Sequence, residues 1–194
     1  VTMGGSNSYT LEGAPSVTYT GTGAVAITGD VDTLSATGGT VTVNGKVELY
    51  SQTKAGTPTI TITGDLGSVS TNNNNTDNGI ATVIQVYGQV TGKMESIGGS
   101  TSAVHMEIGE TDPVKFMLHD GPNGEVRAIF QNNTLTVDNA YTGQYVMAEG
   151  DILYDIVVKN GLFDANEHDI QGDVTFLGEC AKGEIKSGDT LDQN

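Results

Sequence analysis

The sequence is poor in cysteine, in tryptophan and in positive charge. Its 194 residues include one cysteine, no tryptophan, and 8 lysine and arginine residues against 24 aspartate and glutamate residues. The lone thiol, Cys180, excludes an internal disulfide and a cage of several cysteines around a metal. The net charge of −16 argues against nucleic acid and against an anionic membrane surface, because phosphate groups are bound by a positive footprint.

Long apolar segments are also missing. Asp155 interrupts the longest apolar run, ILYDIVV, so we expect no segment that spans a bilayer. The first residues, VTMGGSNS, have neither the charged nor the apolar region of a signal peptide. Proteins without disulfides occur both inside and outside cells, so the cysteine content leaves the compartment open.

Glycine is abundant, with 27 residues, and threonine and asparagine are frequent. All three are poor helix formers. Threonine suits a pleated strand, and glycine and asparagine supply the positive φ angles of turns, so the composition favours short strands joined by many turns. The charge is uneven: residues 1–97 carry 7 acids and 3 bases, a net charge of −4, and residues 98–194 carry 17 acids and 5 bases, a net charge of −12.

Strict alternation of apolar and polar residues recurs along the chain. It is clear in SVTYTGTGAVAITGDV (16–31), GTVTVNGKVELYS (39–51), TPTITITGDL (57–66) and IATVIQVYGQVTG (80–92). Ten to twelve such strands with no helical period predict an all-β antiparallel sandwich, jelly roll or barrel. A β-solenoid is the alternative for the Thr- and Gly-rich first half, and it ranks lower because strict coil periodicity is absent.

Two hairpins are expected in the second half. VKFMLHDGPNGEVRAIF (114–130) has two apolar arms around a turn with one proline and two glycines, and Asn160-Gly161 is expected to close another hairpin within 144–163. We predict one β domain over 1–194. A division near 98–103, into a Thr- and Gly-rich unit (1–97) and an acidic unit (104–194), is the alternative.

An approximate repeat is visible in the first half. ITGDV at 27–31 precedes TVTVNGKV, and ITGDL at 62–66 precedes ATVIQVYGQV. The second unit resembles the first with an insertion, NNNNTDNG, between its strands. Gly-Asp recurs at 150–151 and 172–173, so shared turn chemistry is the preferred explanation. The asparagine tract offers one carboxylate, Asp77, which is too few for a calcium loop, and it is interpreted as an exposed loop.

The acidic stretch 150–173 contains the better cation candidates. We predict an irregular calcium site formed by Asp164, Asn166, Asp169 and Asp173. The EF-hand pattern fails there, because His168 stands where Asp or Asn is usual and Asp169 replaces the required glycine. His105, His119 and His168 lack zinc-site spacing, and no nucleophile motif or phosphate loop is present. No cofactor other than calcium is expected, and the protein is predicted not to be an enzyme.

Turn-rich strands, many small polar residues, one cysteine and high acidity give the chain a general character that resembles structural proteins of tailed-phage virions. These are capsid decoration proteins and tail-tube subunits. The resemblance implies a location in the virion, self-association into trimers or hexamers, and docking on a capsid or tail protein. It transfers no site residues. The alternative is a secreted adhesin, an extracellular filament subunit or a carbohydrate-binding module with calcium loops, located at the cell surface.

Overall fold

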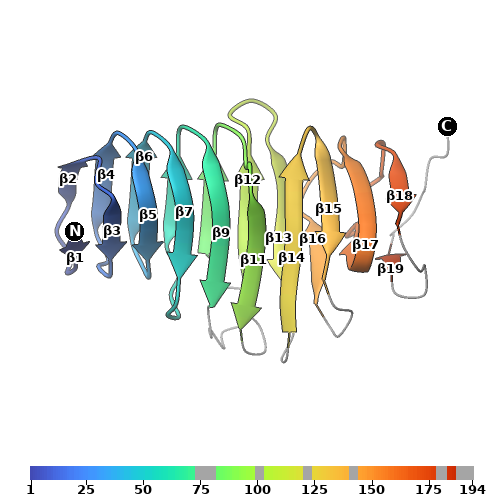
Figure 1. Ribbon diagram of the computed structural model, residues 1–194, viewed down its shortest axis with the longest axis horizontal. Helices are drawn as coiled ribbons and strands as arrows, with labels where there is room; N and C mark the ends of the chain where they lie inside the picture. The colour runs from blue at the N-terminus through green and yellow to red at the C-terminus, as the bar shows by residue number, and fades with distance from the viewer. Residues whose placement is uncertain (73–81, 99–102, 120–123, 140–143, 178–182, 187–194) are drawn as a thin grey trace.

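The protein is an elongated all-β molecule in which short strands stand side by side from one end to the other (Figure 1). The computed structural model describes residues 1–72, 82–98, 103–119, 124–139, 144–177 and 183–186. These residues form nineteen strands and no helix, and therefore no helix that could cross a membrane. The predicted all-β class is confirmed.

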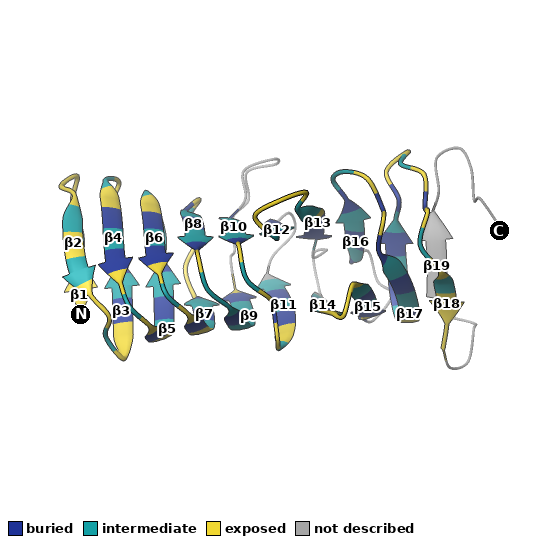
Figure 2. Ribbon diagram, turned by 90° about the horizontal axis from the view of Figure 1, so that it is seen from above, coloured by how far each residue is buried: buried dark blue, intermediate teal, exposed yellow. Residues whose placement is uncertain are grey.

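The strands lie in two layers that face each other (Figure 2). Sheet A contains β1 (Thr2–Met3), β3 (Ser16–Tyr19), β5 (Val31–Ala36), β7 (Val47–Gln52), β9 (Leu66–Asn72), β11 (Lys93–Gly98), β14 (Gly124–Gln131), β15 (Thr134–Asp138), the first part of β17 (Asp155–Asp164) and β18 (Val174–Phe176). Sheet B contains β2 (Tyr9–Glu12), β4 (Ala24–Thr28), β6 (Thr40–Asn44), β8 (Thr59–Ile62), β10 (Thr82–Val86), β12 (Ala103–Ile108), β13 (Val114–His119), β16 (Tyr145–Ala148), the last part of β17 and β19 (Gly183–Lys186). The two layers are one connected sheet because β17 pairs in both.

The chain winds as a β-solenoid. In the first half, each coil contributes one strand to sheet A and the next strand to sheet B, and each strand pairs in parallel with its equivalent in the following coil. One coil alone leaves its apolar face open, so the core forms only when coils stack.

Period-two alternation explains the core. Inward residues of sheet A form a continuous ladder in which each residue is the register partner of the next: Val17, Leu34, Tyr50, Val69, Met94, Ala128, Val137 and Val158. None of these residues is more than 1% exposed. The ladder makes one hydrophobic core from the first half of the chain to the second.

The winding reverses once, in the middle of the molecule. β12 turns back into β13 with antiparallel pairing, and β14 is antiparallel to both β11 and β15. We call β13 and β14 the reversed coil, because each is antiparallel to both of its neighbours, whereas the other strand pairs among the described residues are parallel. The β14–β15 turn contains Asn132 and Asn133 at φ of 52° and 56°, which suits a tight hairpin turn. The parallel order then resumes through β15, β17 and β18.

Stacked glycines form one corner of the solenoid. A Cβ on Gly45 would lie 2.5 Å from the carbonyl carbon and oxygen of Gly29, and one on Gly64 would lie 2.6 Å from the oxygen of Gly45. Asp30 and Asp65 follow this corner, and their Oδ1 atoms accept hydrogen bonds from the next coil, from the backbone N–H groups of Lys46 and Gln89. The two Gly-Asp pairs of the first half, at 29–30 and 64–65, are therefore equivalent corners of alternate coils, and Gly45-Lys46 is the corner of the coil between them.

A buried polar side chain, that of Gln52, closes the corner between β7 and β8. Gln52 Oε1 accepts hydrogen bonds from the hydroxyls of Tyr50 and Thr82 at 2.8 and 2.7 Å. Its Nε2 donates to the carbonyl oxygens of Lys54 and Gly56 at 3.1 and 3.3 Å. The Gln52 side chain provides hydrogen bonds for backbone carbonyls that would otherwise be unpaired at this corner. Burial of the Tyr50 phenol raises its pKa far above the ordinary value.

The predicted sandwich, jelly roll or barrel of ten to twelve strands is wrong, because the strands form a single β-solenoid sheet. Alternation identifies which side chains point inward, but it is the same in a sandwich strand and in a solenoid strand. The coil length also varies: Val25 and Val41 are register partners 16 residues apart, whereas Ile60 and Ile84 are 24 residues apart. This variation hid the period.

Both expected hairpins are wrong in their pairing. The arms of 114–130 are strands, but β13 lies in sheet B beside β12 and β16, and β14 lies in sheet A beside β11 and β15. At Asn160-Gly161 the chain does not turn back. Gly161, at φ 100°, lies where β17 passes from sheet A to sheet B.

Candidate functional site

Charged contacts concentrate around the reversed coil. Five ion pairs among the described residues involve β11, β12, β13, β14 or the residue that follows β16. Side chains on the outer face of each sheet are the ones that a ligand or partner can reach here.

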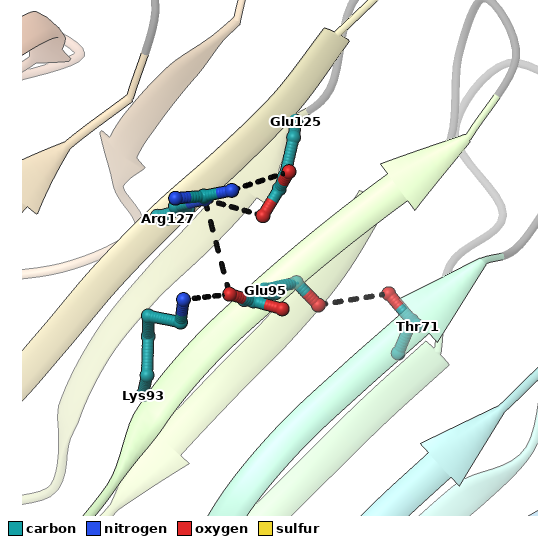
Figure 3. A network of polar contacts seen from close by, with 5 residues as sticks. All are labelled: Thr71, Lys93, Glu95, Glu125 and Arg127. Atoms are coloured by element: carbon teal, nitrogen blue, oxygen red, sulfur yellow. Dashed lines mark hydrogen bonds and ion pairs between the residues drawn. The ribbon is translucent and has the colours of Figure 1, made fainter.

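The outer face of sheet A carries a charged network, which we define as Lys93, Glu95, Glu125 and Arg127 (Figure 3). Lys93 pairs with Glu95, its neighbour along β11. Arg127 Nη2 donates to Glu125 Oε2 at 2.8 Å, and Arg127 Nε lies 3.8 Å from Glu95 Oε1. The hydrogen bond from Arg127 lowers the pKa of Glu125, and the same contact raises the pKa of Arg127.

Two of the ion pairs join residues that lie directly opposite each other on antiparallel strands. Glu95 on β11 faces Arg127 on β14, and Glu107 on β12 faces Lys115 on β13, with Lys115 Nζ 3.6 Å from Glu107 Oε1. Directly opposite unlike charges stabilise a strand pair and like charges destabilise it. The charged network therefore favours this register at the reversal, and its two positive and two negative groups leave little net charge to attract a ligand.

The outer face of sheet B carries a different group, which we call the Met–His cluster: His105, Met117, Met147 and Glu149. His105 faces Met117, and Met117 faces Met147, across three adjacent strands. His105 Nδ1 pairs with Glu149 Oε1. Met117 points outward, because its neighbours Phe116 and Leu118 are fully buried inside, yet it is only 7% exposed.

A stacked pair of rings borders the Met–His cluster. His119 and Tyr145 face each other on β13 and β16, with ring centroids 4.6 Å apart and an angle of 9° between the rings. Burial lowers the pKa of His119, and its buried Nδ1 has no hydrogen-bond partner among the described residues. The stack lies on the same face as the two methionines, which are two residues away along the same strands.

The structure does not gather the predicted calcium ligands into one cluster. Asp164 ends β17, and its Oδ1 accepts the backbone N–H of Asn166 at 2.9 Å. The Asn166 side chain donates to the carbonyl of Ala148 at 3.2 Å, and Asp173 donates its backbone N–H to Asp155 Oδ1 at 2.9 Å. Among the described residues, no three of His, Cys, Asp and Glu lie close enough together to hold a metal ion. The calcium site of Asp164, Asn166, Asp169 and Asp173 stays a prediction.

Other candidates fall elsewhere. Cys180 and most of the asparagine tract lie outside the described residues, so their predicted roles stay untested. His168 donates its backbone N–H to the carbonyl of Ala165 at 2.9 Å, in the turn after β17.

No local sequence pattern predicts the Met–His cluster. Its residues come from three separate segments of the chain, at 105, at 117 and at 147–149, and only the reversed coil brings them to one face. The alternation of VHMEI and KFMLH could have shown that His105 and Met117 point away from the core residues beside them. It could not have shown that their strands are neighbours.

Comparisons with protein-family models, with curated proteins and with solved structures found no match for this chain. The outer faces of the two sheets carry a charged network that stabilises the fold and one cluster with thioether and imidazole groups.

Proposed function

We propose that the chain is a non-enzymatic structural protein that associates with further copies of itself, or docks on a larger assembly, through the edge of its last coil. A virion component, such as a capsid decoration or tail protein, is the assembly that its composition favours. The observation that supports this proposal is an unfinished core ladder at β18.

Phe176 continues the inward ladder of sheet A, since it is the register partner of Val158. Unlike the ladder residues before it, Phe176 is 42% exposed, and the next residue, Leu177, is 47% exposed. Among the described residues β18 pairs only with β17, so it is the edge strand of the described part of sheet A. An edge of this kind recruits strands, and burying a side chain such as Phe176 contributes about 1.5–3 kcal/mol.

The direction of the strands suits a second copy of the same chain. β1 and β18 lie at opposite ends of sheet A, and each is parallel to its neighbour, β3 or β17. A copy stacked on β18 would extend the sheet with the same parallel pairing. Head-to-tail contacts of this type give a ring if the rotation closes and a filament if it does not.

The test is size-exclusion chromatography with light scattering over a range of protein concentrations. We expect a defined oligomer or a polymer, and we expect the double substitution Phe176→Ser, Leu177→Ser to shift the equilibrium towards monomer. Leu153→Ser is the matched control, because Leu153 is 58% exposed but precedes β17 instead of lying at this edge.

A monomer at every concentration, or association that the edge substitutions do not change, would contradict the proposal.

The proposal that the protein is not an enzyme has its own test. Asp164→Ala and Asp169→Ala should alter no catalytic rate, and an activity abolished by either substitution would overturn it.

A further inference from the structure

We propose that the Met–His cluster binds a soft monovalent cation, Cu(I), with His105, Met117 and Met147 as ligands and Glu149 as the group that orients the imidazole. This inference goes beyond the proposed assembly role and does not depend on it.

The strand register brings the three ligands together. His105, Met117 and Met147 occupy consecutive positions across β12, β13 and β16, and the register of the two strand pairs brings all three side chains to the outer face of sheet B. Directly opposite residues on antiparallel strands have Cβ atoms about 4.5–5.5 Å apart. A methionine side chain has three rotatable bonds, so two thioethers and one imidazole can converge on one ion from these positions.

Glu149 prepares the imidazole for binding. Its backbone N–H donates to the carbonyl of Lys115 at 3.2 Å, which places Glu149 beside β13, and its carboxylate reaches His105 Nδ1 from there. A carboxylate on Nδ1 holds the proton on that nitrogen and leaves the lone pair on Nε2. Carboxylate–histidine–metal arrangements of this kind orient the ring and raise the basicity of the ligand nitrogen.

Met117 is sheltered although it belongs to the outer face, and Met147 beside it is partly buried. His105 and Glu149 come from the strands on either side of β13, so their paired side chains meet over this strand, which carries Met117. This explains why Met117 is only 7% exposed. A sheltered thioether loses little hydration when it binds a metal, and the stacked rings of His119 and Tyr145 border the same site.

The ligand types select the ion. Thioether and imidazole groups favour Cu(I), whereas Ca²⁺ and Mg²⁺ need several oxygen ligands and structural zinc sites use Cys, His and carboxylates. The cluster offers one carboxylate, and that group is paired with His105. The net charge of −16 also draws cations to the surface of the protein.

The experiment uses the full chain with Cys180→Ser, because a free thiol would compete for a soft cation. Methionine methyl groups are labelled with ¹³C, and Ag(I), which has the preferences of Cu(I) without its redox chemistry, is added to an equimolar amount. We expect the methyl signals of Met117 and Met147 to shift together. Met94 and Met106 point into the core and serve as internal controls, whose signals should stay in place.

Variants assign the ligands. Met117→Leu and Met147→Leu should each weaken Cu(I) binding by about tenfold or more, measured by competition with a chromophoric chelator, and Glu149→Gln should also weaken it by about tenfold. Met106→Leu is the matched control, because Met106 lies next to His105 in sequence on the same strand but faces inward, and its substitution should leave the affinity unchanged.

Leucine conserves the volume of methionine, so these variants keep the fold, which circular dichroism checks. The proposal fails if equimolar Ag(I) shifts neither methyl signal. It also fails if Met117→Leu and Met147→Leu bind Cu(I) as tightly as the parent chain does.

Discussion

Single residues decide how closely successive coils can approach. The corner glycines lie where one backbone passes over another, and Gly45 has no room for a side chain above Gly29. We predict that Gly45→Ala destabilises the protein by about 1–3 kcal/mol, because the added carbon forces the coils apart. Urea unfolding measures the change. Gly150→Ala is the control: the nearest atoms to an added carbon there belong to Lys115, at 3.9 Å, so we expect little loss. Equal losses at both positions would contradict the close approach.

His119 links stability to pH. Burial lowers its pKa below the ordinary value of 6.5, so the unfolded chain takes up a proton before the folded protein does. The stability that neutral His119 contributes is therefore complete above pH 6.5 and is lost as the pH falls towards the folded-state pKa. We predict that His119→Phe, which keeps the stack on Tyr145, gains stability relative to the parent chain as the pH falls from about 7.5 to about 5.

Urea midpoints of the parent and of His119→Phe, compared across this pH range, measure the effect. Tyr145→Phe keeps the ring stack and adds no group that titrates here, so its difference from the parent should not depend on pH. A difference between His119→Phe and the parent that stays constant with pH would show that His119 is not the group responsible.

Among the elements, the reversed coil is the feature that sets this solenoid apart from a uniform stack. Antiparallel pairing puts Glu95 opposite Arg127, while on its parallel side Glu95 faces the uncharged Ser70. We predict that Glu95→Lys lowers the urea midpoint, because it places a third positive group between Lys93 and Arg127. Adding Arg127→Glu should recover part of the loss, and about 1 M salt should reduce it by screening. A loss that neither change affects would argue against register selection by charge.

The sequence predicts which face of each strand is buried, but it does not predict which strands are neighbours. Alternation in TVTVN, TITI and TVIQV reports inward and outward faces, and the structure confirms these faces. The partner of each strand depends on contacts between coils. Loops of unequal length, such as the one with the asparagine tract, make the repeat period of the coils hard to recognise in the sequence. The Gly-Asp corners at 29–30 and 64–65 were the one local sign of the coils, and turn chemistry alone explained them equally well.

The candidate site depended even more on the fold. The acidic stretch around Asp164 and Asp169 stood out because its residues are close in sequence, whereas the structure does not gather their carboxylates into one cluster. His105 and Met147 are distant in sequence, and two antiparallel strand pairs bring them to one face. A local pattern finds loops that carry several ligands. It does not find ligands that each come from a different strand.

At the scale of the whole molecule, the question is whether the reversed coil divides the solenoid. Solenoids are stabilised by neighbouring coils only, so a weak junction would let the two halves unfold separately. The core ladder crosses the reversal through Met94 and Ala128 without a break. We therefore expect one cooperative unit, consistent with the predicted single domain over 1–194.

Met94→Ala tests this directly, because Met94 is fully buried where the parallel coils meet the reversed coil. The substitution should cost about 2–5 kcal/mol through lost burial and a cavity. In a cooperative solenoid, hydrogen exchange at increasing urea concentration should show peptides from 1–52 and from 144–177 losing protection at the same, lowered midpoint. Met3→Ala, in the first strand, should instead affect only the coils next to it, since Met3 is partly exposed at one end. If Met94→Ala lowers protection in one half and leaves the other unchanged, the reversed coil is a boundary between two folding units.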